Sequence, residues 1–220
     1  MAINLLAPGG ILTRAKDLLQ QKQLLAQQRL ADDFITPAEI SQVFPFSYTA
    51  MQTATLRFFL PNEAELRWLK EHDCLLLPTP PHELCMRGLL DIDANQFCDQ
   101  RSWCRSRRHS FQYREYLPPL TWLKLRKSAV VGTFAKPLAR QVNNLERCER
   151  IPTAVEVAYG IMAYRRVRGV CLFSTYEVRT NSEADHGPTV AIGCEDSKIH
   201  FSQAWDVAEV STLGLAAVHK

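Results

Sequence analysis

The chain has 220 residues, of which 46% are hydrophobic and 22% are charged, and its formal net charge is +3. These are ordinary values for a globular protein, so they exclude global disorder and predict a packed core in one large or two small domains. The sequence contains no run of 18 apolar residues, which excludes a membrane-spanning helix and predicts no membrane partner.

Charge is distributed unevenly along the chain. Residues 1–100 carry 8 Lys and Arg against 12 Asp and Glu, residues 101–180 carry 16 against 5, and residues 181–220 carry 2 against 6. This pattern predicts either a surface for a polyanion such as nucleic acid, or a basic block that the acidic segments neutralise. We favour neutralisation, because sequence position alone does not place the arginines on one face.

Cysteine usage and the N-terminus bear on the compartment. The seven cysteines follow no disulfide or zinc spacing pattern, which predicts reduced thiols and a cytoplasmic location. The first residues have no basic region and no small-residue cleavage site, so we expect no secretory signal.

A long helix is predicted near the N-terminus, over residues 14–31. This segment has no Gly, Pro or β-branched residue, and Ala15, Leu18 and Leu25 fall on one apolar stripe. We expect the helix to pack on its own domain. A partner-binding coil is the alternative, and the apolar repeat is too short to favour it.

Two further helix starts are predicted by capping boxes. Thr36 is followed by Pro37 and, three residues after the threonine, by Glu39, and Asn62 is followed by Glu65 at the same spacing. Such spacing satisfies the free amides of a first helical turn, so both helices belong to a helical part over residues 1–100.

Strands dominate the end of the chain. Residues 74–84 predict a short buried strand that three prolines stop, and residues 136–150 and 152–168 predict helices. The following segments predict strands: 170–180, 188–194, 198–203 and 212–218. Helices followed by strands predict an α+β fold, in which a part over 101–220 ends in helices packed on a twisted antiparallel sheet.

Zinc ligands are the first chemistry to consider. His82 and Cys85 are spaced H-x-x-C, and Cys98, Cys104 and His109 follow. Structural zinc sites usually have two tight pairs, and only one is present here. We therefore predict no metal and no cofactor, and zinc binding by these five residues stays an open alternative.

Catalytic motifs are the second kind of chemistry to consider. The sequence has no G-x-S-x-G, P-loop or G-x-G-x-x-G pattern. Asp91 and Asp93 would point to the same side of an extended segment, but paired carboxylates without convergent partners are typical of a solvated edge. We predict no catalytic residue, and an enzyme of unidentified class remains an alternative function.

Residues 101–116, RSWCRSRRHSFQYREY, combine arginines with aromatic rings. Rings that stack on bases and cations that follow phosphates are how single-stranded nucleic acid is bound, and YRRVR at 164–168 would extend such a surface. In the alternative interpretation, Phe111 and Tyr113 are core residues of a half-buried strand. The candidate binding residues of this segment are Arg101, Trp103, Arg105, Arg107, Arg108 and Tyr113.

A resemblance is carried by the last 100 residues. The motifs are TWLKLRK at 121–127, the helix from Pro152 to Tyr159, Arg179–Thr180, the strand from Val190 to Gly193, and L-G-L at 213–215. Their order resembles a group of uncharacterised bacterial proteins. The tail with Trp205 and Asp206 is also similar to C-type-lectin-like variable proteins of diversity-generating retroelements. That similarity implies a C-type-lectin-like fold with a binding surface at 195–211.

The sequence therefore predicts a non-enzymatic module that binds a protein or other macromolecular ligand through its C-terminal α+β part. From this part we predict His200, Trp205 and Asp206 as binding residues. A nucleic-acid-binding protein that uses residues 101–116 is the alternative function.

Overall fold

The computed structural model describes residues 8–98, 114–184 and 187–220. The chain has an α+β fold, as the sequence predicts. Within the described residues, no helix is both long and apolar enough to cross a membrane. The N-terminal helices are α1 (Pro8–Leu30), α2 (Pro37–Val43), α3 (Ala50–Phe58), α4 (Glu63–Glu71) and α5 (Met86–Ile92), with 3₁₀ turns η1 (Ala31–Asp33) and η2 (Ala94–Gln96).

Both predicted capping boxes are confirmed. The side chain of Thr36 accepts from the Glu39 amide at the start of α2, and Asn62 accepts from the Glu65 amide at the start of α4. Helix α3 has a box of the same kind, which Thr49 and Gln52 form in the order T-x-x-Q. This helix was not predicted.

The first sheet joins strands from distant parts of the sequence. Its order is β1 (Cys74–Pro78), β4 (Trp122–Arg126), β10 (Val218–His219) and β5 (Glu149–Arg150). Strand β1 is the predicted buried strand, and its antiparallel partner β4 lies beyond residue 100. The two predicted parts therefore share a sheet. A separate short pair is formed by β2 (Leu84–Cys85) and β3 (Tyr116–Leu117).

The second sheet is formed by the end of the chain. Its order is β8 (Lys198–Ala204), β7 (Thr189–Glu195), β6 (Glu177–Glu183) and β9 (Leu213–Leu215). The sequence predicts a wholly antiparallel sheet, and this is wrong for β9, which runs parallel to β6. Residues 205–212 run back along the sheet from the end of β8. Strand β9 therefore begins beside the start of β6 and runs in the same direction as β6.

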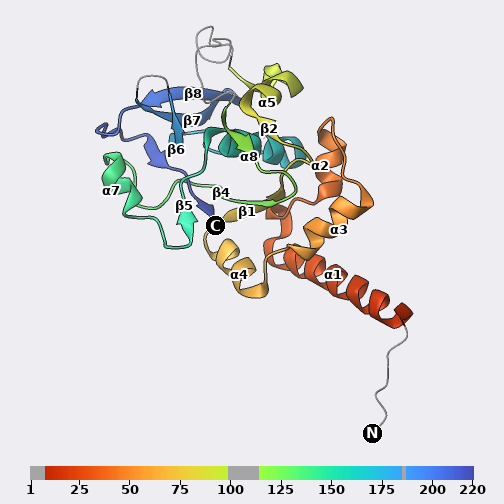
Figure 1. The fold of residues 1–220 in the computed structure, drawn as a ribbon. Helices are drawn as coiled ribbons and strands as arrows, with labels where there is room; N and C mark the ends of the chain where they lie inside the picture. The colour runs from red at the N-terminus through yellow and green to blue at the C-terminus, as the bar shows by residue number, and fades with distance from the viewer. Residues whose placement is uncertain (1–7, 99–113, 185–186) are drawn as a thin grey trace.

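Helix α8 (Ala154–Arg168) lies between the two four-stranded sheets (Figure 1). Gly160 lets it approach β4 closely, because a Cβ there would lie 2.5 Å from Cδ2 of Leu125. The Tyr159 hydroxyl donates to the Pro78 carbonyl at 2.7 Å, which ties the helix to β1. Helix α8 is thus the centre of the main core.

Three further predictions in the second half are wrong. Residues 136–150 form only the short α7 (Leu138–Val142) and β5, because Pro137 and the turn at 143–148 limit the helix. Residues 170–176 precede β6 as turns. Cys171 and Cys194 form a disulfide, so the expectation that every cysteine is a reduced thiol fails for this pair.

Candidate functional site

One face of the second sheet packs on the main core, and the loop of residues 205–212 covers part of the other face. Val178, Ile192 and Phe201 point into the main core with α8. Because side chains alternate along a strand, their neighbours in sequence point the opposite way. Glu177 and His200 are such neighbours, on β6 and β8, and they face each other across Gly193 of the central strand β7.

The imidazole of His200 reaches across β7 to the carboxylate of Glu177. Its Nε2 lies 2.7 Å from Glu177 Oε1, and the Ser202 hydroxyl donates to Glu177 Oε2 at 2.6 Å. The bridge passes over Gly193, where a Cβ would lie 2.8 Å from His200 Cε1. The glycine of the predicted V-x-I-G strand is therefore needed for close approach of a side chain rather than for a special φ angle.

The electrostatics of the bridge favours an imidazolium beside a carboxylate. The hydrogen bond to Glu177 raises the pKa of His200 against the opposing effect of burial, and Glu195 adds to the increase. Burial raises the pKa of Glu177, but hydrogen bonds from His200 and Ser202 outweigh it and the net shift is downward. Each group thus favours the charged form of the other.

A cleft of about 340 Å³ lies beside this ion pair. The arrangement is not a serine–histidine pair for nucleophilic catalysis, because Ser202 donates to the carboxylate and not to the imidazole. His200 Nδ1 is buried without a hydrogen-bond partner among the described residues. The cleft is lined by Ser174, Thr175, Tyr176, Glu177, Cys194, Glu195, His200 and Thr212.

Arg179 binds the backbone of the loop that joins β8 to β9, residues 205–212. Its side chain is fully buried, and its Nη2 donates to the carbonyls of Trp205 and Ala208, both at 2.9 Å. Its Nη1 donates to the Asp206 carbonyl at 3.4 Å. A single guanidinium therefore fixes the backbone of residues 205–208 while their side chains face outward.

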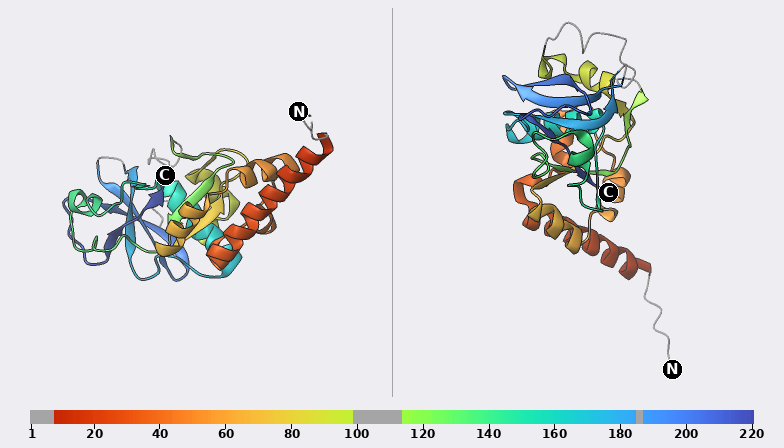
Figure 2. Two further views of the ribbon diagram at one scale, coloured as in Figure 1. Left: turned by 90° about the horizontal axis from the view of Figure 1, so that it is seen from below. Right: turned by 90° about the vertical axis from the view of Figure 1, so that its left-hand side faces the viewer.

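This loop and the region around α7 each carry exposed apolar side chains. The Ala135 amide donates to the Val210 carbonyl at 3.1 Å and the Leu138 amide to the Asp206 carbonyl at 2.8 Å, so the two segments lie side by side. Helix α7 is on the side of the molecule away from α1 (Figures 1 and 2). We define the Trp205 surface as the exposed side chains of Val131, Phe134, Val142, Trp205, Val207 and Val210.

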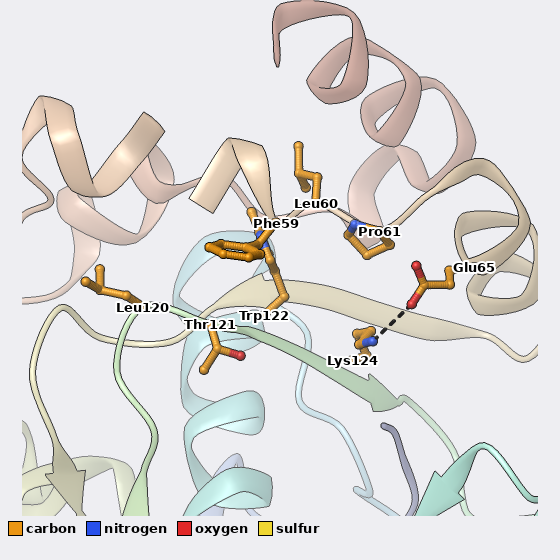
Figure 3. A pocket seen from close by; sticks show the side chains of 8 residues that line it. All are labelled: Phe59, Leu60, Pro61, Glu65, Leu120, Thr121, Trp122 and Lys124. Carbon is orange, nitrogen blue, oxygen red and sulfur yellow. Dashed lines mark hydrogen bonds and ion pairs between the residues drawn. The ribbon is translucent and has the colours of Figure 1, made fainter. Parts of the chain in front are cut away.

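A second hollow, of about 360 Å³, lies where α3 ends and β4 begins. Figure 3 shows Phe59 on one side of it and the pair of Lys124 and Glu65, 3.4 Å apart, at the other. Lys124 also donates to the Lys220 carbonyl at 2.7 Å, and Trp122 donates to the Leu56 carbonyl at 2.8 Å. These polar groups already have partners within the chain, so they offer few free hydrogen bonds to a ligand.

The predicted binding residues have different outcomes. Trp205 and Asp206 lie in the loop above Arg179, whereas His200 lies in the cleft with Glu177. Six predicted binding residues lie outside the described residues and stay a prediction: Arg101, Trp103, Arg105, Arg107, Arg108 and Tyr113.

The arginines of YRRVR make contacts within the chain. Arg165 donates to Gln96 Oε1 at 3.1 Å. Arg166 pairs with Asp93 at 2.7 Å and lies over the Phe44 ring, and Arg168 pairs with Glu39 at 2.7 Å. These guanidinium groups are occupied by the protein itself, as the neutralisation hypothesis expects of this part of the basic block.

The predicted metal ligands and the paired carboxylates have separate outcomes. Over residues 8–98, 114–184 and 187–220, no three His, Cys, Asp or Glu side chains are grouped to hold a metal ion. His82 packs edge-on against Phe46, and Cys104 and His109 lie outside these ranges. The extended arrangement of Asp91 and Asp93 is wrong, because α5 includes Asp91 and ends before Asp93.

Sequence reasoning missed Glu177 and Arg179 as site residues. Both flank Val178 in the sequence and share the strand face opposite to its side chain, in a segment correctly expected to contain a strand. Charged residues that alternate with apolar ones in this way indicate one polar strand face, which was the available signal. Phe134 and Val131 had no such signal, because their exposure depends on a turn that the sequence does not reveal.

Comparisons with family models, curated proteins and solved structures found no significant match to this chain. The similarity of the tail to C-type-lectin-like proteins therefore stays a prediction. Function must be inferred from the geometry of the described residues.

Proposed function

We propose that this chain is a non-enzymatic protein-binding module and that the Trp205 surface contacts its partner. The observation that carries the proposal is an exposed aromatic and aliphatic group on a backbone that Arg179 holds fixed. A preorganised surface loses little conformational entropy on binding, which favours recognition by such a loop.

The degree of exposure supports a contact role. Trp205 is 58% exposed, Val207 is 82% exposed and Val131 is 83% exposed. Tryptophan is enriched among the residues that dominate protein interfaces, because it buries a large area with few rotatable bonds. A group of exposed apolar side chains on two adjoining loops is typical of an interface centre.

The charges near the Trp205 surface favour a protein over a polyanion. Lys136 and Arg140 lie on the α7 segment, and Asp206 and Glu209 lie on the loop. A surface for nucleic acid needs positively charged side chains, whereas a rim with both positive and negative side chains fits a protein partner with complementary charges. We therefore expect a partner with an apolar contact centre and a mixed charged rim.

The test is affinity capture with the tagged full chain, followed by measurement of the purified partner. We expect Trp205→Ala combined with Val207→Ser to weaken binding at least about tenfold, the effect of removing an interface hot spot. Met51→Ser is the matched control, because Met51 is 80% exposed on α3, away from this surface.

The two variants decide the proposal. Equal loss of binding in the surface variant and the control would contradict it, as would unchanged affinity in the surface variant. Retention of the wild-type chain on single-stranded DNA that decreases steeply with salt would instead support the nucleic-acid alternative.

A further inference from the structure

Helix α1 is only partly covered by the rest of the molecule. Ala26 and Leu30 are buried in a second core cluster with Leu56, Leu66 and Leu69, so the C-terminal half packs on α3 and α4 as the sequence predicts. The N-terminal half extends away from the sheets in all three views (Figures 1 and 2). A helical segment without tertiary packing is marginal in water, so a partner packed along α1 would stabilise it.

An apolar groove of about 510 Å³ lies between α1 and α3. Leu18, Gln21 and Leu25 follow one another at spacings of three and four residues, on one stripe of α1. Leu18 and Phe58 are both 62% exposed, so these apolar walls are uncovered. The groove is lined by Leu18, Leu19, Gln21, Lys22, Leu25 and Phe58.

The shape of this groove fits a helix better than a flat surface. Side chains of a third helix fill the hollow between two packed helices, because ridges of side chains fit into grooves. An amphipathic helix also presents apolar residues at the three- and four-residue spacings that the stripe on α1 has. A lipid bilayer is flat on this scale and would leave the groove unfilled. The geometry therefore favours a helical segment as the occupant.

Two cations near the groove have no acidic partner. The Nζ of Lys22 lies 5.7 Å from the centroid of the Phe58 ring and donates to the Phe58 carbonyl at 3.1 Å. Arg57 precedes Phe58 on α3 and is exposed. Neither Lys22 nor Arg57 makes an ion pair with another described residue, whereas Arg29 pairs with Glu63 at 2.8 Å. A helix with carboxylates beside its apolar stripe would supply the missing anions.

The charge of α1 argues against a second copy of the chain in this groove. Residues 14–29 include Arg14, Lys16, Lys22 and Arg29 but only one acid, Asp17. Two such helices side by side would bring like charges together, which is unfavourable. The charges therefore select a different protein, whose helix has an acidic flank.

We propose that the α1–α3 groove binds an amphipathic helix of a partner protein. Apolar residues of that helix pack against Leu18, Leu25 and Phe58, and its acidic residues lie beside Lys22 and Arg57. The apolar stripe of α1 covers about two turns, which is small against the roughly 800 Å² per partner of a standard interface, so the complex is transient. The groove is separate from the Trp205 surface, because α7 is on the side of the molecule away from α1 (Figure 1).

Fluorescence anisotropy with synthetic peptides tests the groove on the full chain. The probe is a labelled peptide of about 15 residues, long enough to form a helix in water, with leucines at three- and four-residue spacings and glutamates on both flanks. The matched peptide has lysines in place of the glutamates. The chain binds the glutamate peptide saturably and more weakly as the salt concentration rises. It binds the lysine peptide at least about tenfold more weakly, because like charges meet at the rim.

Substitutions in the groove identify the contact. Leu18→Gln and Phe58→Ser each weaken binding of the glutamate peptide at least about tenfold, because each removes an exposed apolar wall. Both side chains are exposed, so the fold stays intact, and circular dichroism verifies this. Lys22→Glu combined with Arg57→Glu reverses the preference, and this variant binds the lysine peptide more tightly than the glutamate peptide.

Two controls leave the binding of both peptides unchanged. Lys198→Glu makes the same kind of charge change at an exposed position at the start of β8. Trp205→Ala combined with Val207→Ser alters the Trp205 surface, so this groove and that surface are tested independently.

Four results would overturn the proposal. The first is no saturable binding of the glutamate peptide, and the second is equal binding of the glutamate and lysine peptides. The third is binding of phosphatidylserine vesicles that Leu18→Gln abolishes while neither peptide binds, which would identify a bilayer as the occupant. The fourth is a concentration-dependent dimer in sedimentation velocity that Leu18→Gln abolishes, which would identify a second copy.

Discussion

The guanidinium of Arg179 lies beneath the backbone of Trp205 and donates to its carbonyl at 2.9 Å. Arg179 has no ion-pair partner in the described part of the chain, and its hydrogen bonds go to carbonyls of the loop. Burial lowers the pKa of Arg179 from its ordinary value, but arginine stays protonated at any physiological pH. The charge thus stabilises a loop conformation.

Arg179→Met is expected to destabilise the fold by about 2–4 kcal/mol, because it leaves the carbonyls of the loop without donors in a buried place. Chemical unfolding measures the change in free energy. The variant should also bind the partner of the Trp205 surface more weakly than its remaining folded fraction explains. Arg140→Met is the control, since Arg140 is exposed on α7, and it should change the unfolding free energy by less than about 0.5 kcal/mol.

Local signals account for what the sequence could predict. The capping boxes at Thr36 and Asn62 depend on side chains three residues apart, so the helix starts they predict are correct. The buried strand at 74–78 is correct because its prolines limit it on one side. Both features are decided within a few residues of the chain.

Long-range relationships account for what was missed. His200 and Glu177 are 23 residues apart and meet only because β7 lies between their strands. The parallel β9 depends on a loop that Arg179 holds from beneath the backbone, and no local pattern contains that information. The basic block was ambiguous for the same reason, because its acidic partners are distant in the sequence. Arg166 pairs with Asp93 at the end of α5, and Arg168 pairs with Glu39 on α2.

Gly193→Ala is expected to destabilise the protein by about 1–3 kcal/mol, the usual effect of an extra methyl group in a packed place. The new Cβ would lie 2.8 Å from His200 Cε1 and 3.0 Å from the Tyr176 carbonyl oxygen. His200→Ala removes the first of these contacts and leaves the second. A double-mutant cycle with both substitutions should therefore show a coupling of at least about 0.5 kcal/mol, and strict additivity would contradict the crossing of His200 over Gly193.

The His200–Glu177 ion pair predicts a pH dependence of stability. Because the pKa of His200 is raised in the fold, its contribution is fully present below the ordinary histidine value of 6.5 and is lost as the pH rises through the folded value. Because the pKa of Glu177 is lowered, its contribution is present above the ordinary value of 4.5 and is lost as the pH falls through the folded value. The pair therefore contributes most between these two ordinary values.

The measurement compares the unfolding free energy of the wild type with that of His200→Gln from about pH 6 to about pH 9. The difference should decrease as the pH rises, since only the wild type loses the imidazolium. Nuclear magnetic resonance of the His200 ring should give a titration midpoint above 6.5, and Glu177→Gln should move it down. A midpoint below 6.5 in the wild type would show that burial, and not Glu177, dominates.

The Cys171–Cys194 disulfide predicts a difference between oxidised and reduced protein. It joins the turn before β6 to the end of β7 and closes a loop with a sequence separation of 23 residues. A cross-link over this distance stabilises a fold by about 3 kcal/mol through the entropy of the unfolded chain. Cys171→Ser combined with Cys194→Ser should therefore lower the unfolding free energy by about this amount, to the level of the reduced wild type.

Alkylation followed by mass spectrometry identifies the thiols directly. In protein purified without reductant, Cys171 and Cys194 should stay unmodified after unfolding, whereas the half-buried Cys148 reacts. Cys74 should react only after unfolding, because burial raises its pKa to about 12 and keeps it as a thiol. Cys148→Ser is the control for stability, since its loss breaks no cross-link. If Cys171 and Cys194 were alkylated in unfolded protein that had met no reductant, the two cysteines would be ordinary thiols, and the entropic stabilisation would be absent.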